Sequence, residues 1–273
     1  MTDIAILIIA MLATGIVGGV LAGLLGVGGG IVIVPVLELV LELLGVPPDY
    51  RMHMAVATSL AVIIPTSISS ARAHHIRGAV DINLAKRWAP FIALGAIIGV
   101  LIASQVSGPT LTAVFGIFAL LVAAKMILPF DQKTITPEVP KGAAIAMIPT
   151  SIGTISSMMG IGGGTLTVVT LTLMGETIHR AVGTSALFGL LISIPGTIGF
   201  IVSGWGNEQL LPGSLGFVNM AGFAMIAPAT VLAAPLGARL AHALSRRRLS
   251  QLFGLFLLIF ATRMLLQSIS ERF

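Results

Sequence analysis

The stretch from Ile4 to Leu37 contains no charged side chain. A membrane-spanning helix needs about 20 apolar residues, and a soluble core helix needs fewer. Similar uncharged stretches recur along the chain, and only 9% of its residues are charged, against about 25% in soluble domains. The mean hydropathy is +1.06. The sequence therefore predicts an all-α integral membrane protein with very little mass outside the lipid bilayer.

Composition and charge exclude several functions. The loops are too short for a soluble catalytic domain, and no catalytic constellation occurs within the spans, so we expect no enzyme. The chain has no cysteine, and His74 and His75 are too few for a metal site, so we expect neither metal nor cofactor. The net charge of +5 resides mostly in short loops, as the positive-inside rule predicts, which argues against nucleic acid. With Asp3 alone before the apolar run, the N-terminus is interpreted as an uncleaved first span.

An internal repeat organises the chain. With an offset of 138, residues 78–128 align without gaps to 216–266 and share 17 identities in 51 positions, against about 10% expected by chance from such biased composition. The offset falls to 134 at two glycine clusters and to 126 at two Thr-Ser pairs, while the order of landmarks is kept. We expect two membrane repeats, 1–130 and 141–273, joined by a polar linker, 131–140.

Loop charges distinguish the two copies. Residues 108–110 align with three arginines at 246–248, whereas the basic loop 72–87 aligns with 204–224, which has no lysine or arginine. If basic residues mark the cytoplasmic side, equivalent loops lie on opposite sides of the membrane. The prediction is therefore two inverted-topology repeats, an arrangement common among secondary transporters, whose sites lie near the membrane midplane.

We expect roughly 8–10 membrane segments. In each half, two apolar stretches flank a glycine cluster and three longer segments follow. The second stretch of each pair has about 14 residues or fewer, too short for a full span, which suggests half-helices or re-entrant segments. The expected segments are 4–25, 31–44, 55–71, 88–106 and 110–128, and then 143–159, 166–174, 181–203, 217–241 and 249–267.

The glycine clusters, residues 26–30 and 160–164, are the first candidates for a binding site. Polar backbone at membrane depth is tolerated only where protein buries it or where it lines a watery cavity. A helix is expected to start near each cluster's end, where free N–H groups and the helix dipole favour an anion. Tight helix packing by small residues is the alternative. The selected substrate-binding glycines are Gly28, Gly29, Gly30, Gly162, Gly163 and Gly164.

Two hydroxyl pairs complete the predicted site. Thr58 and Ser59 recur as Thr184 and Ser185, each pair near the start of a helix. Hydroxyls can donate to an anion at depth without the cost of burying a charge. Hydrogen bonding between or within helices is the alternative.

Ionisable groups within the spans are few. Lys125 and Arg263 are equivalent by the offset of 138 and are expected to anchor helix ends at the interface. Glu38 and Glu42 lie four residues apart, on one helical face. They suggest either a proton site or, as we expect, a wet helix end, because the second half has no equivalent pair.

The motifs also resemble a known family. Residues 22–30 read AGLLGVGGG and are followed by Pro35, and the core of this stretch recurs at 160–164. The pattern resembles the sulfite exporter TauE/SafE family over nearly the whole chain, although Val169 replaces the proline in the second copy. The resemblance implies a permease of the bacterial cytoplasmic membrane for small sulfur-containing anions, such as sulfite or organosulfonates, often acting in export.

Together these features predict a secondary transporter, an exporter by family resemblance, that moves a small sulfur-containing anion by alternating access. A passive small-anion channel and a permease for a non-sulfur organic anion remain the alternatives. The expected partners are the small anion, the lipid bilayer and a coupling ion, H⁺ or Na⁺. The oligomeric state is left open.

Overall fold

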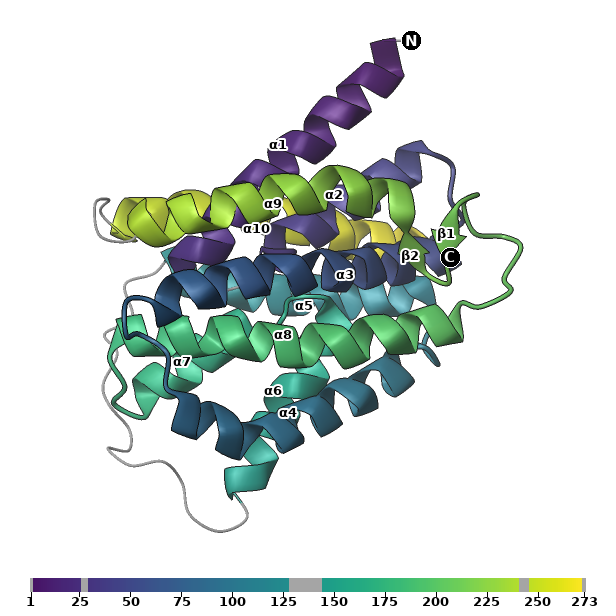
Figure 1. Cartoon of the computed structure of the whole chain (residues 1–273). Coiled ribbons are helices and arrows are strands. Elements are labelled where there is room, and N and C mark those ends of the chain that lie inside the picture. The colour runs from purple at the N-terminus through teal and green to yellow at the C-terminus, as the bar shows by residue number, and fades with distance from the viewer. Residues whose placement is uncertain (1, 26–28, 128–143, 241–245, 272–273) are drawn as a thin grey trace.

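The computed structural model describes residues 2–25, 29–127, 144–240 and 246–271. These residues form a helical bundle with one short hairpin between α8 and α9 (Figure 1). The all-α class is confirmed, whereas the hairpin, β1 (Ser214–Leu215) paired antiparallel with β2 (Val218–Asn219), was not predicted. The helices are α1 (Thr2–Leu25), α2 (Gly30–Leu43), α3 (Pro48–His75), α4 (Ile82–Ala103), α5 (Gly108–Ile127), α6 (Ala144–Met159), α7 (Gly164–Leu173), α8 (Ile178–Ser203), α9 (Met220–Leu240) and α10 (Arg246–Ser270).

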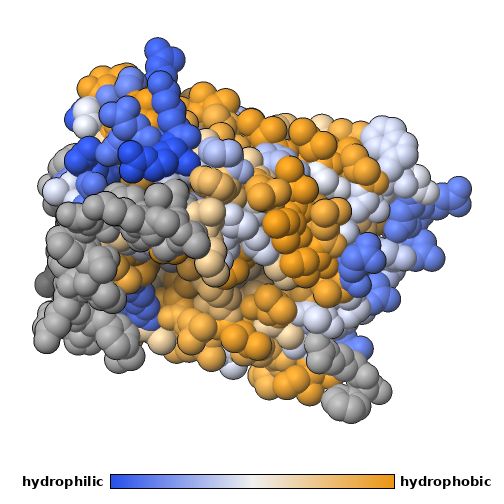
Figure 2. Space-filling model, turned by 90° about the horizontal axis from the view of Figure 1, so that it is seen from below, coloured by the Kyte–Doolittle hydropathy of each residue, from blue (hydrophilic) through white to orange (hydrophobic). Residues whose placement is uncertain are grey.

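Six helices in the described part of the chain, α3, α4, α5, α8, α9 and α10, are long and apolar enough to cross a membrane. Their outward side chains include Leu121, Leu232 and Ile259, which are 63%, 76% and 61% exposed. Figure 2 shows hydrophobic residues across the middle of one face, with hydrophilic residues gathered at its two ends. The chain is therefore a multi-pass membrane protein with apolar side chains facing lipid.

The two short helices match their predicted lengths. α2 has 14 residues and α7 has 10, which at 1.5 Å per residue is less than a bilayer core. Each is followed, two residues after its last residue, by a glycine with positive φ, Gly45 (76°) and Gly175 (84°). The chain then turns into a long helix, α3 or α8, which starts immediately after Pro47 or Thr177.

Helix contacts in one half recur in the other. α1 packs along α9, and α6 along α4. A Cβ atom on Gly19 would lie 2.5 Å from the carbonyl oxygen of Thr230, and one on Gly153 would meet the carbonyl oxygen of Ile92. These two contacts are equivalent in the repeat. Gly19 corresponds to Gly153 by the offset of 134, and Ile92 corresponds to Thr230 by the offset of 138. In the same way, the contact of Gly237 with Val20 corresponds to that of Gly99 with Thr154. The contact of Gly116 with Leu265 corresponds to that of Gly254 with Ile127.

The central helices α3 and α8 lie side by side and run antiparallel (Figure 1). The N–H of Asp81, beyond the end of α3, donates to the hydroxyl of Thr184 near the start of α8 (3.0 Å). The N–H of Asn219, beyond the end of α8, donates to the hydroxyl of Thr58, the eleventh residue of α3 (2.9 Å). Each half thus supplies a backbone donor to the equivalent threonine of the other half. The expected linker, 131–140, lies outside the described residues.

The close contact between α1 and α9 predicts a specific sensitivity to bulk. Gly19→Leu should lower the free energy of unfolding by about 1–3 kcal/mol, because the added side chain meets the backbone of α9. Ala13→Leu is the matched control, since Ala13 is exposed on the same helix. Thermal unfolding in detergent measures both variants, and equal melting temperatures would contradict the packing.

Candidate functional site

The two glycine motifs contact each other inside the bundle. A Cβ atom on Gly30, the first residue of α2, would overlap the carbonyl oxygen of Gly160 and lie 3.0 Å from the Cα of Ile161. The same carbonyl of Gly160 accepts a hydrogen bond from Ser59 of α3 at 2.8 Å. A side chain at position 30 would prevent this backbone approach. Close packing is therefore one role of the motifs.

Each motif also starts a short helix, as predicted. Gly29 and Gly163 precede α2 and α7 with φ values of 77° and 74°, in the left-handed region that favours glycine. The first N–H groups of a helix have no partner within it. In α7 the N–H of Thr167 is bonded to the carbonyl of Gly163 (2.9 Å). The N–H groups of Gly164 and the two residues after it therefore lie at the positive end of the helix dipole. Gly28 lies outside the described residues.

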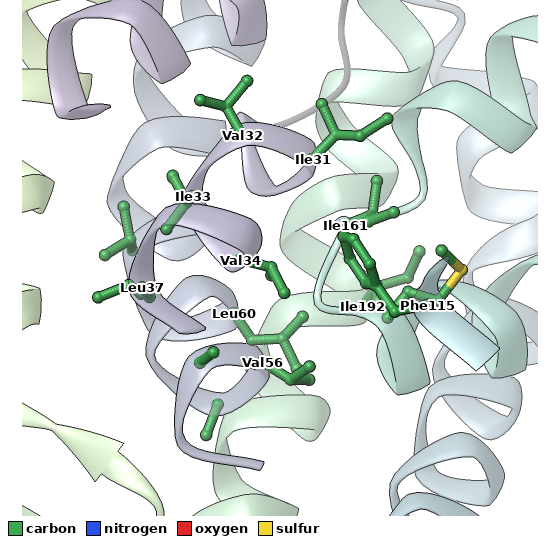
Figure 3. Close-up of a cluster of buried hydrophobic side chains, with 14 of the residues drawn as sticks. Ile31, Val32, Ile33, Val34, Leu37, Val56, Leu60, Phe115, Ile161 and Ile192 are labelled. Carbon is green, nitrogen blue, oxygen red and sulfur yellow. The ribbon is translucent and has the colours of Figure 1, made fainter. Parts of the chain in front are cut away.

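Apolar side chains enclose this junction. Figure 3 shows Ile31 and Val34 of α2 on one side and Ile161, Ile192 and Phe115 on the other. These five side chains are at most 5% exposed. A polar group placed here is shielded from water, so its electrostatic interactions are stronger than at the surface.

Three buried hydroxyls surround the second motif without a hydrogen bond of their own. The hydroxyl oxygens of Ser67, Ser156 and Thr167 have no partner in the described part of the chain, and these residues are at most 1% exposed. A Cβ atom on Gly163 would lie 3.5 Å from the Ser156 hydroxyl and 3.7 Å from that of Thr167.

The Ser67 hydroxyl reaches the same region from α3. It would lie 2.5 Å from a Cβ on Gly189, which in turn would be 3.2 Å from the carbonyl oxygen of Gly162. Leaving a buried hydroxyl unbonded costs about 1–3 kcal/mol, so each such group in a native protein calls for an explanation. Three around one glycine motif make this region the candidate site for a hydrogen-bonding ligand. We call Ser67, Ser156 and Thr167 the hydroxyl cluster.

The hydroxyl cluster belongs mainly to the second motif. The offset of 134 matches Ser156 to Ala22 and Thr167 to Ile33, both buried and apolar. Sequence inspection missed these residues because isolated hydroxyls are common in membrane helices. The sequence did contain one signal. Ser156 and Thr167 are polar, whereas the equivalent residues of the first half are apolar.

The predicted hydroxyl pairs are buried but already engaged. Thr58 and Thr184 accept the two backbone N–H groups that join the halves. Ser59 donates to Gly160, and Ser185 donates to the carbonyl of Val182 at 2.8 Å. Ser59 thus bonds the backbone of a glycine motif.

For the charged groups, the expectation for Glu38 was wrong and that for Arg263 was incomplete. Glu38 is not at a wet helix end, because it is only 1% exposed. Arg263 does not only anchor a helix end, because its guanidinium binds Glu38 at 3.0 Å and also binds Glu42. The sequence could not reveal this pairing, since the partners are 225 residues apart.

Comparison with known proteins identifies the family. The model of the sulfite exporter TauE/SafE family matches residues 11–264. The chain belongs to this family. It is 37% identical over 262 residues to a probable membrane transporter protein of Haemophilus influenzae, covering 95% of this chain and 98% of that protein.

More distant relatives share the same description. A probable membrane transporter protein of Bacillus subtilis is 27% identical over 232 residues, covering 76% of this chain and 84% of its own length. One of Methanocaldococcus jannaschii is 27% identical over 241 residues, covering 86% and 84%. No solved structure matches significantly. Family and relatives together indicate that the chain is a membrane transporter.

Two serines of α3 give a direct comparison of structural and free hydroxyls. Ser59→Ala should lower stability by about 1–3 kcal/mol, because it leaves the Gly160 carbonyl without this donor. Ser67→Ala should leave stability unchanged or raise it, because its hydroxyl has no partner to lose. Thermal unfolding of the two variants compares them under the same conditions. A larger loss in Ser67→Ala would contradict the assignment.

The bridging threonines allow a second test. Thr58→Val and Thr184→Val should each lower stability by about 1–3 kcal/mol, because each leaves a backbone N–H without its acceptor. Thr197→Val is the control, since Thr197 is 7% exposed and its hydroxyl is unpartnered. Denaturation in detergent measures the three variants. Equal stability of all three would show that the bridges contribute nothing.

Proposed function

We propose that this protein is a secondary transporter that exports a small sulfur-containing anion, such as sulfite or an organosulfonate, from a bacterial cytoplasm. The observation that carries the proposal is the hydroxyl cluster beside the N-terminus of α7. Three free hydroxyls and the first N–H groups of a helix are all hydrogen-bond donors. Donors in a water-excluded site suit the several acceptor oxygens of a sulfite or sulfonate group.

The family supports the choice of substrate class. Its description names sulfite export, and a tetrahedral or pyramidal sulfur oxyanion presents oxygens in several directions. The hydroxyl cluster comes from three helices, α3, α6 and α7, and therefore approaches a ligand from different sides. Hydroxyl and amide donors bind an anion without the desolvation cost of a buried lysine.

The arrangement of the halves supports alternating access as the mechanism. We take 1–130 and 141–273 as repeats of opposite membrane orientation, because α3 and α8 are antiparallel and the contacts of one half recur in the other. The site lies where α3, from the first repeat, meets α6 and α7, from the second. Rocking of one repeat against the other would expose such a site to each side in turn.

Binding is tested first, by thermal shift of the purified protein with sulfite, sulfate, thiosulfate, taurine, isethionate and simple carboxylates. A ligand at about 100 times its Kd adds about 2.7 kcal/mol of stability. We expect the shift only with sulfur anions. A shift only with carboxylates would support a permease for non-sulfur organic anions instead.

The double variant Ser156→Ala/Thr167→Val locates the site. Removing two donors to an anion should weaken binding at least about tenfold, since each such bond contributes about 1.5–3 kcal/mol. The matched control is Ser151→Ala/Thr170→Val on the same two helices, because Ser151 is exposed and Thr170 bonds its own helix. Unchanged affinity in the first variant would overturn the site.

Transport is then measured in liposomes that contain only this protein. A transporter should exchange labelled anion faster when unlabelled anion is present on the opposite side, because the loaded carrier returns more readily. A passive channel would show no such stimulation and only weak saturation.

A further inference from the structure

Carboxylates and guanidinium groups from three helices form an ionic cluster at one end of the bundle. Arg51 of α3 lies 3.8 Å from Glu38, 3.5 Å from Glu42 and 3.0 Å from Glu271. Arg263 of α10 binds Glu38 at 3.0 Å and also binds Glu42. We call these five residues the ionic cluster. Where side chains are described, Glu38 and Arg51 are the only buried members of the Asp, Glu, Lys and Arg set.

The charges of the ionic cluster do not balance. Among the described residues, three carboxylates face two guanidinium groups, so these five groups, when fully ionised, carry one excess negative charge. α1 also packs on α2 but has no charged residue between positions 8 and 24. At the buried Glu38 an uncompensated charge is costly, and one bound proton removes it. The cluster therefore has capacity for a single proton.

Hydrogen-bonding groups in the cluster are also incompletely used. Nε and Nη1 of Arg51 form no hydrogen bond in the described part of the chain, although Arg51 is only 8% exposed. Gln267 donates through Nε2 to Glu38 and to Glu271, each at 3.0 Å, while its Oε1 accepts nothing there. An amide suits both protonation states, because its nitrogen donates to a carboxylate and its oxygen accepts from a protonated carboxyl group.

The ionic cluster reaches the surface of the bundle at Glu42. The side chain of Glu42 is 38% exposed, whereas that of Glu38 is 2% exposed. The two carboxylates are one helical turn apart, and Arg263 binds both. A proton can enter at Glu42 and pass to Glu38 without crossing the apolar core.

The ionic cluster is connected to the candidate substrate site through α2. This helix begins at Gly30, against the second glycine motif, and carries Glu38 eight residues further on, about 12 Å along its axis. Binding of a proton weakens the attraction of α2 to Arg51 and Arg263, and so alters how firmly α2 is held at the junction. The equivalent positions of the second half differ, since Thr172, equivalent to Glu38 by the offset of 134, bonds the carbonyl of Val168 in its own helix (2.8 Å). Glu176, equivalent to Glu42, lies beyond the end of α7 and pairs with the exposed Arg180 at 3.4 Å.

We propose that the ionic cluster of Glu38, Glu42, Glu271, Arg51 and Arg263 binds the proton that couples anion transport to the proton gradient. The proposal rests on the transport function proposed above. It makes a prediction about charge: neutralising any one carboxylate balances the two arginines, so the cluster no longer takes up a proton. Both Glu38→Gln and Glu42→Gln should then carry the anion without coupling.

The test uses the full chain in liposomes, with labelled sulfite as the probe and the membrane potential held at zero. Two quantities are measured: exchange of sulfite at equal pH, and accumulation of sulfite driven by a gradient of about one pH unit of either sign. One coupled proton drives about tenfold accumulation. We expect this in the wild type, with exchange but no accumulation in Glu38→Gln and Glu42→Gln.

Controls separate the possible failures. Glu208→Gln alters an exposed loop carboxylate and should behave as the wild type, and protein-free liposomes correct for leakage. Accumulation that persists in either cluster variant, or wild-type exchange without any pH-driven accumulation, would overturn the proton site and leave the transporter intact. Absence of wild-type sulfite exchange would remove both proposals. If Glu38→Gln is not monodisperse, Glu42→Gln decides alone, because its side chain is partly exposed and easier to replace.

Discussion

The backbone contact between the two glycine motifs is the constraint on which the rest of the structure depends. Position 30 has no room for a Cβ atom, because the carbonyl of Gly160 occupies that space. This contact brings the start of α2 against the segment that leads into α7. The start of one helix too short to cross a membrane thus packs on the segment that precedes the other, and this polar backbone is enclosed by protein rather than by lipid. A substrate site inside the bundle becomes possible for the same reason.

The exchange of contacts between halves explains how this junction is held. α1 packs on α9 and α6 on α4, so the first helix of each half is held by the fourth helix of the other. Glycines make these approaches close enough for backbone to meet backbone, as at Gly19 and Gly153. Asp81 and Asn219 add mirrored N–H bonds from one half to the other. Neither half can bury its own motif alone, which makes the junction a property of the pair.

Much of this architecture was predictable because it depends on patterns that lie close together in the sequence. Apolar runs and glycine positions predicted the starts of α2 and α7 at Gly30 and Gly164, and the repeat offset predicted the equivalent helices. The site was less accessible. Thr58 and Thr184 were chosen for their hydroxyls, but whether a buried hydroxyl is free or engaged depends on partners such as Asn219, 161 residues away. The pairing of Arg263 with Glu38 is equally non-local, and the two-residue strands of the hairpin are too short for a periodic signal.

The departures from symmetry carry more functional information than the symmetry itself. An exact repeat would place equal groups on both sides of the junction, yet Ser156 and Thr167 correspond to Ala22 and Ile33. Conversely, the end of α2 carries charged residues, whereas α7, the equivalent helix, ends at Leu173 without one. α2 has 14 residues and α7 has four fewer. Free hydroxyls thus concentrate at the motif of one half and ionised groups on the short helix of the other. Under the two proposals above, a change of charge in the ionic cluster would act through α2 on the junction that the hydroxyl cluster adjoins.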